Sequence, residues 1–277
     1  MSSTFLDYKD TINNYLKIND WRVKENSTVT YSVGGLILSN SGAITANYWL
    51  SEIYDQEIEK AHRDADIHIH DLSMLTGYCA GWSLKQLITE GLGGVPGKIT
   101  SKPASHLSTL CNQMTNFLGI MQNEWAGAQA FSSFDTYLAP FVKIDNLSYR
   151  DVKQCIQSFV YGVNTPSRWG TQAPFTNITL DWVVPNDMAE LNAIVGGKEM
   201  DFKYKDCVKE MAMVNKAFIE IMIEGDANGR GFQYPIPTYS ITNNFDWSET
   251  ENNKLLFEMT AKYGTPYFSN YINSDME

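Results

Sequence analysis

The residue types best suited to chemistry gather in one stretch, ADIHIHDLSMLTGYCAGWSL, which contains His68, His70, Asp71 and Cys79. On a strand, side chains at i and i+2 share a face, so both imidazoles could reach one metal ion. The pair could instead be structural, with ring nitrogens satisfied by neighbouring groups. It could also handle protons beside Cys79, because histidine changes charge near neutral pH. A metal site needs further ligands, and His106 is the only later histidine, so we expect no metal.

The environment of Cys79 differs from that of the chain's other three cysteines. Gly77 and Gly81 flank it closely, and such small neighbours let another chain segment or a substrate approach. Taken alone, Cys79 could equally be a small buried apolar residue. The other cysteines fall on or beside apolar helix stripes and are expected to be structural; they are Cys111, Cys155 and Cys207. The sequence has no CxxC pair that would indicate a zinc ribbon or a disulfide framework.

A second polar stretch, NTPSRWGTQAPFTNITLDW (164–182), leads into a predicted strand. Loops dense in small hydrogen-bonding side chains suit a polar ligand such as a sugar phosphate. A turn with local side-chain to backbone hydrogen bonds explains the same composition. The glycine-rich runs at 91–98 and 225–231 lack the spacing of a phosphate-binding loop, and we interpret them as helix ends and turns.

The elements that position these groups are predicted to be short strands separated by long helices. This alternation predicts an α/β fold with a largely parallel sheet, in a single continuous unit. Ser148 and Asp151 form a predicted capping box at the start of one helix. Helices are predicted at 47–62, 82–91, 106–124, 128–142, from 148, 204–224 and 249–263, and strands at 67–70, 175–184, within 231–242 and at 265–272.

Composition narrows the function classes. The formal net charge of −11 argues against a DNA-binding surface. No stretch approaches the roughly 20 apolar residues of a membrane span, and the first residues lack the apolar core of a secretory signal. We therefore expect a cytoplasmic protein with no membrane or DNA partner.

Seven segments in one order resemble the anaerobic, class III ribonucleotide reductases, the glycyl-radical enzymes that make deoxynucleoside triphosphates. The resemblance extends from about Asn19 to the end of the chain. It is carried by DWRVKENSTVTYSVGGL, HIHDLSMLTGYCAGWSLKQLI, GLGGVPGKITSKPASHL, QNEWAGAQAFSSFDTYLAPFV, YGVNTPSRWGTQAPFTNITLDW, IEGDANGRGFQYPIPTY and MTAKYGTPYFSNYINSD.

The resemblance implies a ten-stranded α/β barrel of two five-stranded halves, of which this chain would supply the first half. In the family, a glycyl radical oxidises a loop cysteine to a thiyl, which removes the ribose 3′-hydrogen so that the 2′-hydroxyl leaves as water. A second cysteine on the first barrel strand donates a hydrogen atom, and formate commonly supplies the electrons. Cys79 matches that second cysteine. His70 is the better candidate for contacting formate or the leaving hydroxyl, and His68 for orienting this region.

The resemblance also implies a ribonucleoside triphosphate substrate, an ATP or deoxynucleotide effector bound between subunits of a homodimer, and activation by a radical S-adenosylmethionine enzyme. Effector contacts are expected on residues 105–142 and at Lys143, where a basic side chain suits phosphates. The expected substrate contacts are Asn164, Ser167, Arg168, Gln172, Thr176 and Asn177, and the expected effector contacts are Gln122, Glu124, Gln129 and Lys143.

The finger-loop cysteine, the second half-barrel, the four-cysteine zinc site and the radical glycine of the family have no counterpart in these 277 residues. We therefore expect one partial domain, 1–277, that is inactive alone. It would take its glycyl radical, and any zinc, from a complementary C-terminal polypeptide. The alternatives are a non-catalytic nucleotide-binding or dimerisation module derived from the fold and, more remotely, a metal-dependent hydrolase using His68 and His70.

Overall fold

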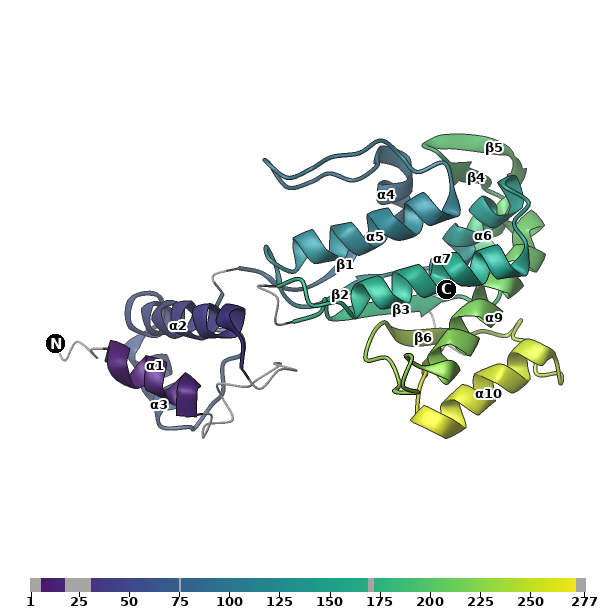
Figure 1. Cartoon of the computed structure of the whole chain (residues 1–277). Coiled ribbons are helices and arrows are strands. Elements are labelled where there is room, and N and C mark those ends of the chain that lie inside the picture. The colour runs from purple at the N-terminus through teal and green to yellow at the C-terminus, as the bar shows by residue number, and fades with distance from the viewer. Residues whose placement is uncertain (1–5, 18–30, 75, 169–171, 273–277) are drawn as a thin grey trace. The chain divides into compact units, whose positions relative to one another are not determined.

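The computed structural model describes residues 6–17, 31–74, 76–168 and 172–272 (Figure 1). The chain divides into two compact units. The first comprises Met1–Cys79, Gln122–Gly127 and Thr165–Ala173, and the second comprises Ala80–Met121, Ala128–Asn164 and Pro174–Glu277. Residues 20–30, 75, 169–171 and 273–275, parts of four segments that carry the family resemblance, lie outside the described residues.

Helices dominate the first unit. They are α1 (Tyr8–Lys17), α2 (Val33–Tyr48), which continues into a π-helical turn (Trp49–Ile53), and α3 (Gln56–Arg63). The hydroxyl of Ser32 caps α2 by accepting a hydrogen bond from the Gly35 N–H at 2.8 Å. The helix predicted at 47–62 is helical over most of its length but is not one helix, because the backbone becomes extended at Tyr54 and Asp55 before α3 begins. Helix α2 escaped prediction because its apolar residues surround the axis and give no amphipathic stripe.

The predicted strand at 67–70 is also wrong, because these residues lie in loop and turn conformations. Asp71 adopts a left-handed conformation with φ 53°. This breaks the extended geometry that two alternating isoleucines had suggested. The strand begins instead at Tyr78.

A five-stranded sheet forms the framework of the fold, in the order β1-β2-β3-β6-β7. The three pairs from β2 to β7 are all parallel, which confirms the predicted α/β class with a parallel sheet. Ile178 pairs with both Phe131 and Pro237, so the centre of the sheet is in continuous register. The strands are β1 (Tyr78–Trp82), β2 (Ala126–Phe131), β3 (Thr176–Leu180), β6 (Ile236–Ile241) and β7 (Tyr267–Asn270).

The helices of the second unit pack in a chain of neighbours, with α5 on α7, α7 on α9, and α9 on both α6 and α10 (Figure 1). The predicted capping box is confirmed, since Ser148 Oγ accepts from the Asp151 N–H and the Asp151 carboxylate accepts from the Ser148 N–H. The helices are α4 (Leu84–Glu90), α5 (Leu107–Met121), α6 (Phe134–Ile144), α7 (Tyr149–Val163), α8 (Asn186–Ala189), the 3-10 turn Tyr204–Cys207, α9 (Val208–Glu224) and α10 (Glu251–Tyr263).

Two β elements were missed in the sequence. The residues AGAQAF form β2, where a helix was predicted to begin at 128, because alanine and glutamine carry no strand signal. An antiparallel hairpin of β4 (Asn192–Val195) and β5 (Lys198–Lys203) turns at Gly196 and Gly197, both with positive φ. A Gly-Gly pair between two short runs is a hairpin signal and could have revealed it.

Candidate functional site

Cys79 lies in β1 at an exposed position. It is the exposed cysteine, whereas Cys111 and Cys207 are buried and Cys155 is half-buried. Burial raises the pKa of the Cys111 thiol far above its usual range and that of Cys207 to about 12. Those two thiols stay protonated and unreactive near neutral pH. Cys79 is therefore the most accessible of the four cysteines.

The backbone of Cys79 is left-handed, with φ 55°. Such a conformation is uncommon for a residue other than glycine, and it persists only where surrounding contacts impose it. Gly127 supplies one of these contacts, because a Cβ atom added there would lie 2.8 Å from Cys79 Sγ. The sulfur thus rests against the bare backbone of the neighbouring segment.

Three histidines cluster near the loop that precedes β1. The rings of His68 and His70 meet edge to face with centroids 4.5 Å apart, and the His62 ring lies 5.8 Å from that of His68. His62 Nδ1 accepts a hydrogen bond from the Ile69 N–H at 3.2 Å. Partial burial and the charge of His68 lower the pKa of His62. Neutral His62 therefore anchors the loop that carries the two predicted catalytic histidines.

No group of three or more His, Cys, Asp or Glu side chains that could hold a metal ion occurs within the described ranges. Both His68 and His70 are exposed. The other histidine, His106, pairs through Nδ1 with the Asp145 carboxylate at 3.0 Å.

Predicted substrate and predicted effector residues meet in one cluster of the first unit. Gln122, only 2 % exposed, donates through its side chain to Ser167 Oγ and to the Gln172 carbonyl. Arg168 donates to the Gln122 and Trp125 carbonyls and to Gln172 Oε1. The side chains of Gln122 and Arg168 are thus used within the protein to join the segments 122–127 and 165–173.

Asn164 has a structural task. Its amide nitrogen donates to the carbonyls of Val160 at 2.7 Å and Tyr234 at 2.6 Å. Its Oδ1 accepts from the N–H groups of Gln233 and Tyr234. These four hydrogen bonds use the full capacity of the side chain and fasten the loop before β6 to the end of α7.

Of the two remaining predicted substrate contacts, Thr176 is buried and donates to the Pro174 carbonyl at 2.9 Å, while Asn177 is half-buried on β3.

The remaining predicted effector residues do not converge on one place. Gln129 is buried, donates to the Leu118 carbonyl and accepts from Trp82 Nε1 at 2.8 Å. Lys143 donates to the Asp206 carbonyl at 3.1 Å. Glu124 is exposed, and its backbone carbonyl accepts from the Thr76 hydroxyl at 2.6 Å. It lines a polar cavity of about 420 Å³ in the first unit, which Arg168 also lines.

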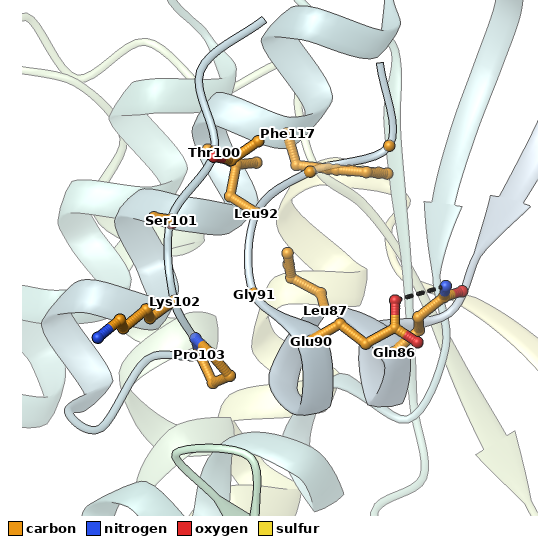
Figure 2. A pocket seen from close by; sticks show the side chains of 12 residues that line it. Gln86, Leu87, Glu90, Gly91, Leu92, Thr100, Ser101, Lys102, Pro103 and Phe117 are labelled. Carbon is orange, nitrogen blue, oxygen red and sulfur yellow. Dashed lines mark hydrogen bonds between the residues drawn. The ribbon is translucent and has the colours of Figure 1, made fainter. Parts of the chain in front are cut away.

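The second unit contains a larger cavity, of about 590 Å³, between the end of α4 and the segment 100–103 (Figure 2). Gln86 donates to Glu90 at 2.9 Å on one wall, and Lys102 extends away from the other labelled side chains. None of the predicted contacts lines it. The lining residues are Gln86, Leu87, Glu90, Gly91, Leu92, Gly93, Gly94, Thr100, Ser101, Lys102, Pro103 and Phe117.

A buried pair of acids, Asp135 in the first turn of α6 and Asp181 directly after β3, was not predicted as a site. Asp135 accepts from four N–H groups, those of the Thr136, Asp181 and Trp182 backbones and of the Asn215 side chain, at 2.8–3.1 Å. Asp181 accepts from the Thr136 hydroxyl at 2.5 Å. Burial, together with the neighbouring Asp135, raises the pKa of Asp181 to about 7. An acidic residue inside an otherwise apolar predicted strand, Asp181 in ITLDW, was the available signal.

The comparisons with known proteins identify the family. A family model described as anaerobic ribonucleoside-triphosphate reductase matches residues 25–277. The chain belongs to this family. The resemblance inferred from the sequence segments is thereby confirmed. A search of curated proteins returned no match. In the described part of the chain, no helix is long and apolar enough to cross a membrane.

Solved structures of anaerobic ribonucleotide reductases share the fold. The enzyme from Thermotoga maritima in complex with dATP and CTP superposes with a TM-score of 0.67 at 18% identity, covering 99% of this chain and 51% of that one. The same enzyme with citrate in its active site gives 0.67 at 21%, with coverages of 95% and 50%. A further anaerobic ribonucleotide reductase gives 0.68 at 20%, with 97% and 44%. The chain spans about half the length of these reductases.

Proposed function

We propose that this chain is the substrate- and effector-binding part of a longer or split anaerobic ribonucleoside-triphosphate reductase. The observation that carries the proposal is the family match combined with the exposed Cys79 on the first strand of the sheet. The described sheet would be the first half of a ten-stranded barrel, and residues 1–277 one partial domain completed by a C-terminal polypeptide.

The net reaction is ribonucleoside triphosphate plus formate plus one proton giving deoxyribonucleoside triphosphate, carbon dioxide and water. The glycyl radical, supplied from outside this chain, would provide the thiyl that removes the ribose 3′-hydrogen. Cys79 would then donate its thiol hydrogen atom to the substrate radical, and its exposed side chain fits that role. The formate electrons would restore the thiol.

His70 would protonate the departing 2′-hydroxyl, because a hydroxyl leaves far more easily as water. His68, edge to face with His70, would orient that ring. The cluster formed by Gln122, Ser167, Arg168 and Gln172 lies in the same unit as Cys79 and would border the bound nucleotide.

We propose the remaining partners on the ground of the family match. The substrate would be a ribonucleoside triphosphate and the effector ATP or a deoxynucleotide, in keeping with the dATP and CTP of the Thermotoga maritima complex. A homodimer and a radical S-adenosylmethionine activating enzyme complete the proposal. Any zinc would belong to the C-terminal polypeptide.

The test is a reductase assay on this chain assembled, without oxygen, with the polypeptide that completes it. Cys79→Ser should lower deoxynucleotide formation by about a thousandfold, because serine has no thiol hydrogen to donate. Cys155→Ser on α7 is the matched control and should stay within about twofold. Full activity of Cys79→Ser would refute the assigned role. An assembly that binds nucleotide without turnover would instead favour a non-catalytic module.

A further inference from the structure

Cys79 and the residues just before it lie against residues 124–127. Thr76 Oγ1 donates to the Glu124 carbonyl at 2.6 Å, and the Ala126 N–H donates to the Gly77 carbonyl at 3.0 Å. These hydrogen bonds hold residues 76–79 against residues 124–127. We call residues 124–127 the cysteine seat.

Two glycines make this close approach possible. A Cβ atom on Gly77 would lie 2.4 Å from the ring of Trp125, and one on Gly127 would lie 2.8 Å from Cys79 Sγ and 3.2 Å from Cys79 N. Real Cβ contacts are essentially never shorter than 3.0 Å, so the approaches to the Trp125 ring and to Cys79 Sγ would require a shift. Gly127 also has φ 75°, a conformation that favours glycine. Any side chain at 127 would therefore displace the sulfur or the backbone beneath it.

The cysteine seat is itself fastened by one guanidinium group. Arg168 Nε donates to the Gln122 carbonyl at 2.7 Å, and Nη2 donates both to this carbonyl and to that of Trp125, at 3.1 Å for the latter. Nη1 donates to Gln172 Oε1 at 3.1 Å. The planar fork thus holds the Trp125 carbonyl of the seat and the Gln122 carbonyl just before it at a fixed separation, which a lysine ammonium could not reproduce.

Backbone hydrogen bonds also join Ser167 and Arg168 to Gln172. The N–H groups of Ser167 and Arg168 donate to the Gln172 carbonyl at 2.9 and 3.1 Å, and the Gln122 side chain donates to this carbonyl at 3.3 Å. The guanidinium is therefore anchored from both ends.

We propose that Arg168 is a positioning residue for the Cys79 thiol, acting through the cysteine seat and Gly127. This rests on the proposed function only in that Cys79 is the reacting thiol. It gives Arg168 a task separate from any contact with substrate: the arginine holds the segment against which the sulfur lies.

The test measures the rate at which iodoacetamide alkylates Cys79 in the folded chain, followed by mass spectrometry of the peptide that contains it. Arg168→Lys loosens the seat and Gly127→Ala pushes the sulfur from it. Both should raise the rate by at least about threefold, because the sulfur loses the cover of Gly127. The matched controls are Arg150→Lys on α7 and Gly81→Ala on β1, where an added Cβ meets nothing within 4 Å. Both controls should leave the rate unchanged.

Circular dichroism and thermal melting establish which variants are folded. If Arg168→Lys does not fold, Gln172→Ala takes its place, since it removes the acceptor of Nη1 and leaves the arginine. Folded variants at 168 or 172 that alkylate at the wild-type rate would overturn the proposal, whatever Gly127→Ala does. The readout needs no turnover, so it is independent of whether Cys79→Ser abolishes nucleotide reduction.

Discussion

At the scale of single residues, the polar side chains that the sequence placed in one predicted substrate site have different hydrogen-bond partners in the structure. The sequence grouped Asn164, Ser167 and Arg168 as substrate contacts because small polar side chains are concentrated there. In the structure, the Asn164 side chain uses all its donors and acceptors in hydrogen bonds to α7 and to the loop before β6. A composition signal could not separate these tasks, because a turn and a ligand site use the same residue types.

Replacing Asn164 tests which task prevails. Asn164→Leu leaves two N–H groups and two carbonyls without their amide partner, so we expect a loss of about 2–3 kcal/mol in the free energy of unfolding. Urea denaturation of the purified chain measures it. Asn177→Leu on β3, half-buried and without this clamp, is the control. Unchanged stability of Asn164→Leu with weakened nucleotide binding would favour the predicted substrate contact instead.

At the scale of elements, the buried acids connect helix α6, which carries Asp135, to the end of strand β3 and to helix α9. Burial raises the pKa of Asp135, and its four N–H donors act against that rise. Asn215 on α9 donates to Asp135 and accepts from Tyr239 on β6 at 3.0 Å, which extends the network across the sheet. Such networks fix the arrangement of elements only while every polar member is satisfied.

The raised pKa of Asp181 makes the free energy of unfolding depend on pH. An unfolded aspartate loses its proton near pH 4, whereas Asp181 in the fold keeps it to about pH 7. The folded state therefore binds more protons between these values, and stability from this group falls as pH rises through the window.

The measurement compares urea denaturation at pH 4.5 and pH 7.5 for the wild type and Asp181→Asn. The wild type should lose on the order of 3 kcal/mol more than the variant, because asparagine does not ionise. Subtracting the change in the free energy of unfolding of the variant removes the contribution of the exposed acids. Glu190 and Asp246 are two such acids, and their pKa values are lowered. Equal pH dependence in both proteins would show that Asp181 does not titrate in this range.

At the scale of the whole molecule, strand β7 is the last strand at one edge of the sheet. Among the described residues, no further strand pairs with its outer side. Tyr267 is 62 % exposed and Phe268 41 % exposed on that strand. Exposed apolar side chains on an unpaired edge favour pairing with another chain. This agrees with the proposal that the sheet is completed by a second polypeptide.

We therefore expect the isolated chain to self-associate at micromolar concentrations. Phe268→Glu should shift it toward the monomer in size-exclusion chromatography with light scattering, because a charge on the edge opposes strand pairing. Phe257→Glu, which changes an exposed phenylalanine on α10 (47 % exposed), should leave the association unchanged. A monomeric wild-type chain would count against the proposal.

The sequence by itself determined the family, the α/β class with its parallel sheet and the capping box at Ser148. These depend on local periodicity and on ordered motifs, which are present before the chain folds. Helix α2 and strand β2 could not be predicted, because one is apolar around its whole axis and the other is built of small residues without strand propensity.

Only the tertiary structure decided how the polar residues are used. It joined Gln122 to Ser167, Arg168 to the carbonyls beneath Cys79, and Asp135 to Asp181. These partners lie about 45 residues apart in sequence. Hydrogen bonds of this kind depend on distance in space, and no pattern along the chain encodes that distance.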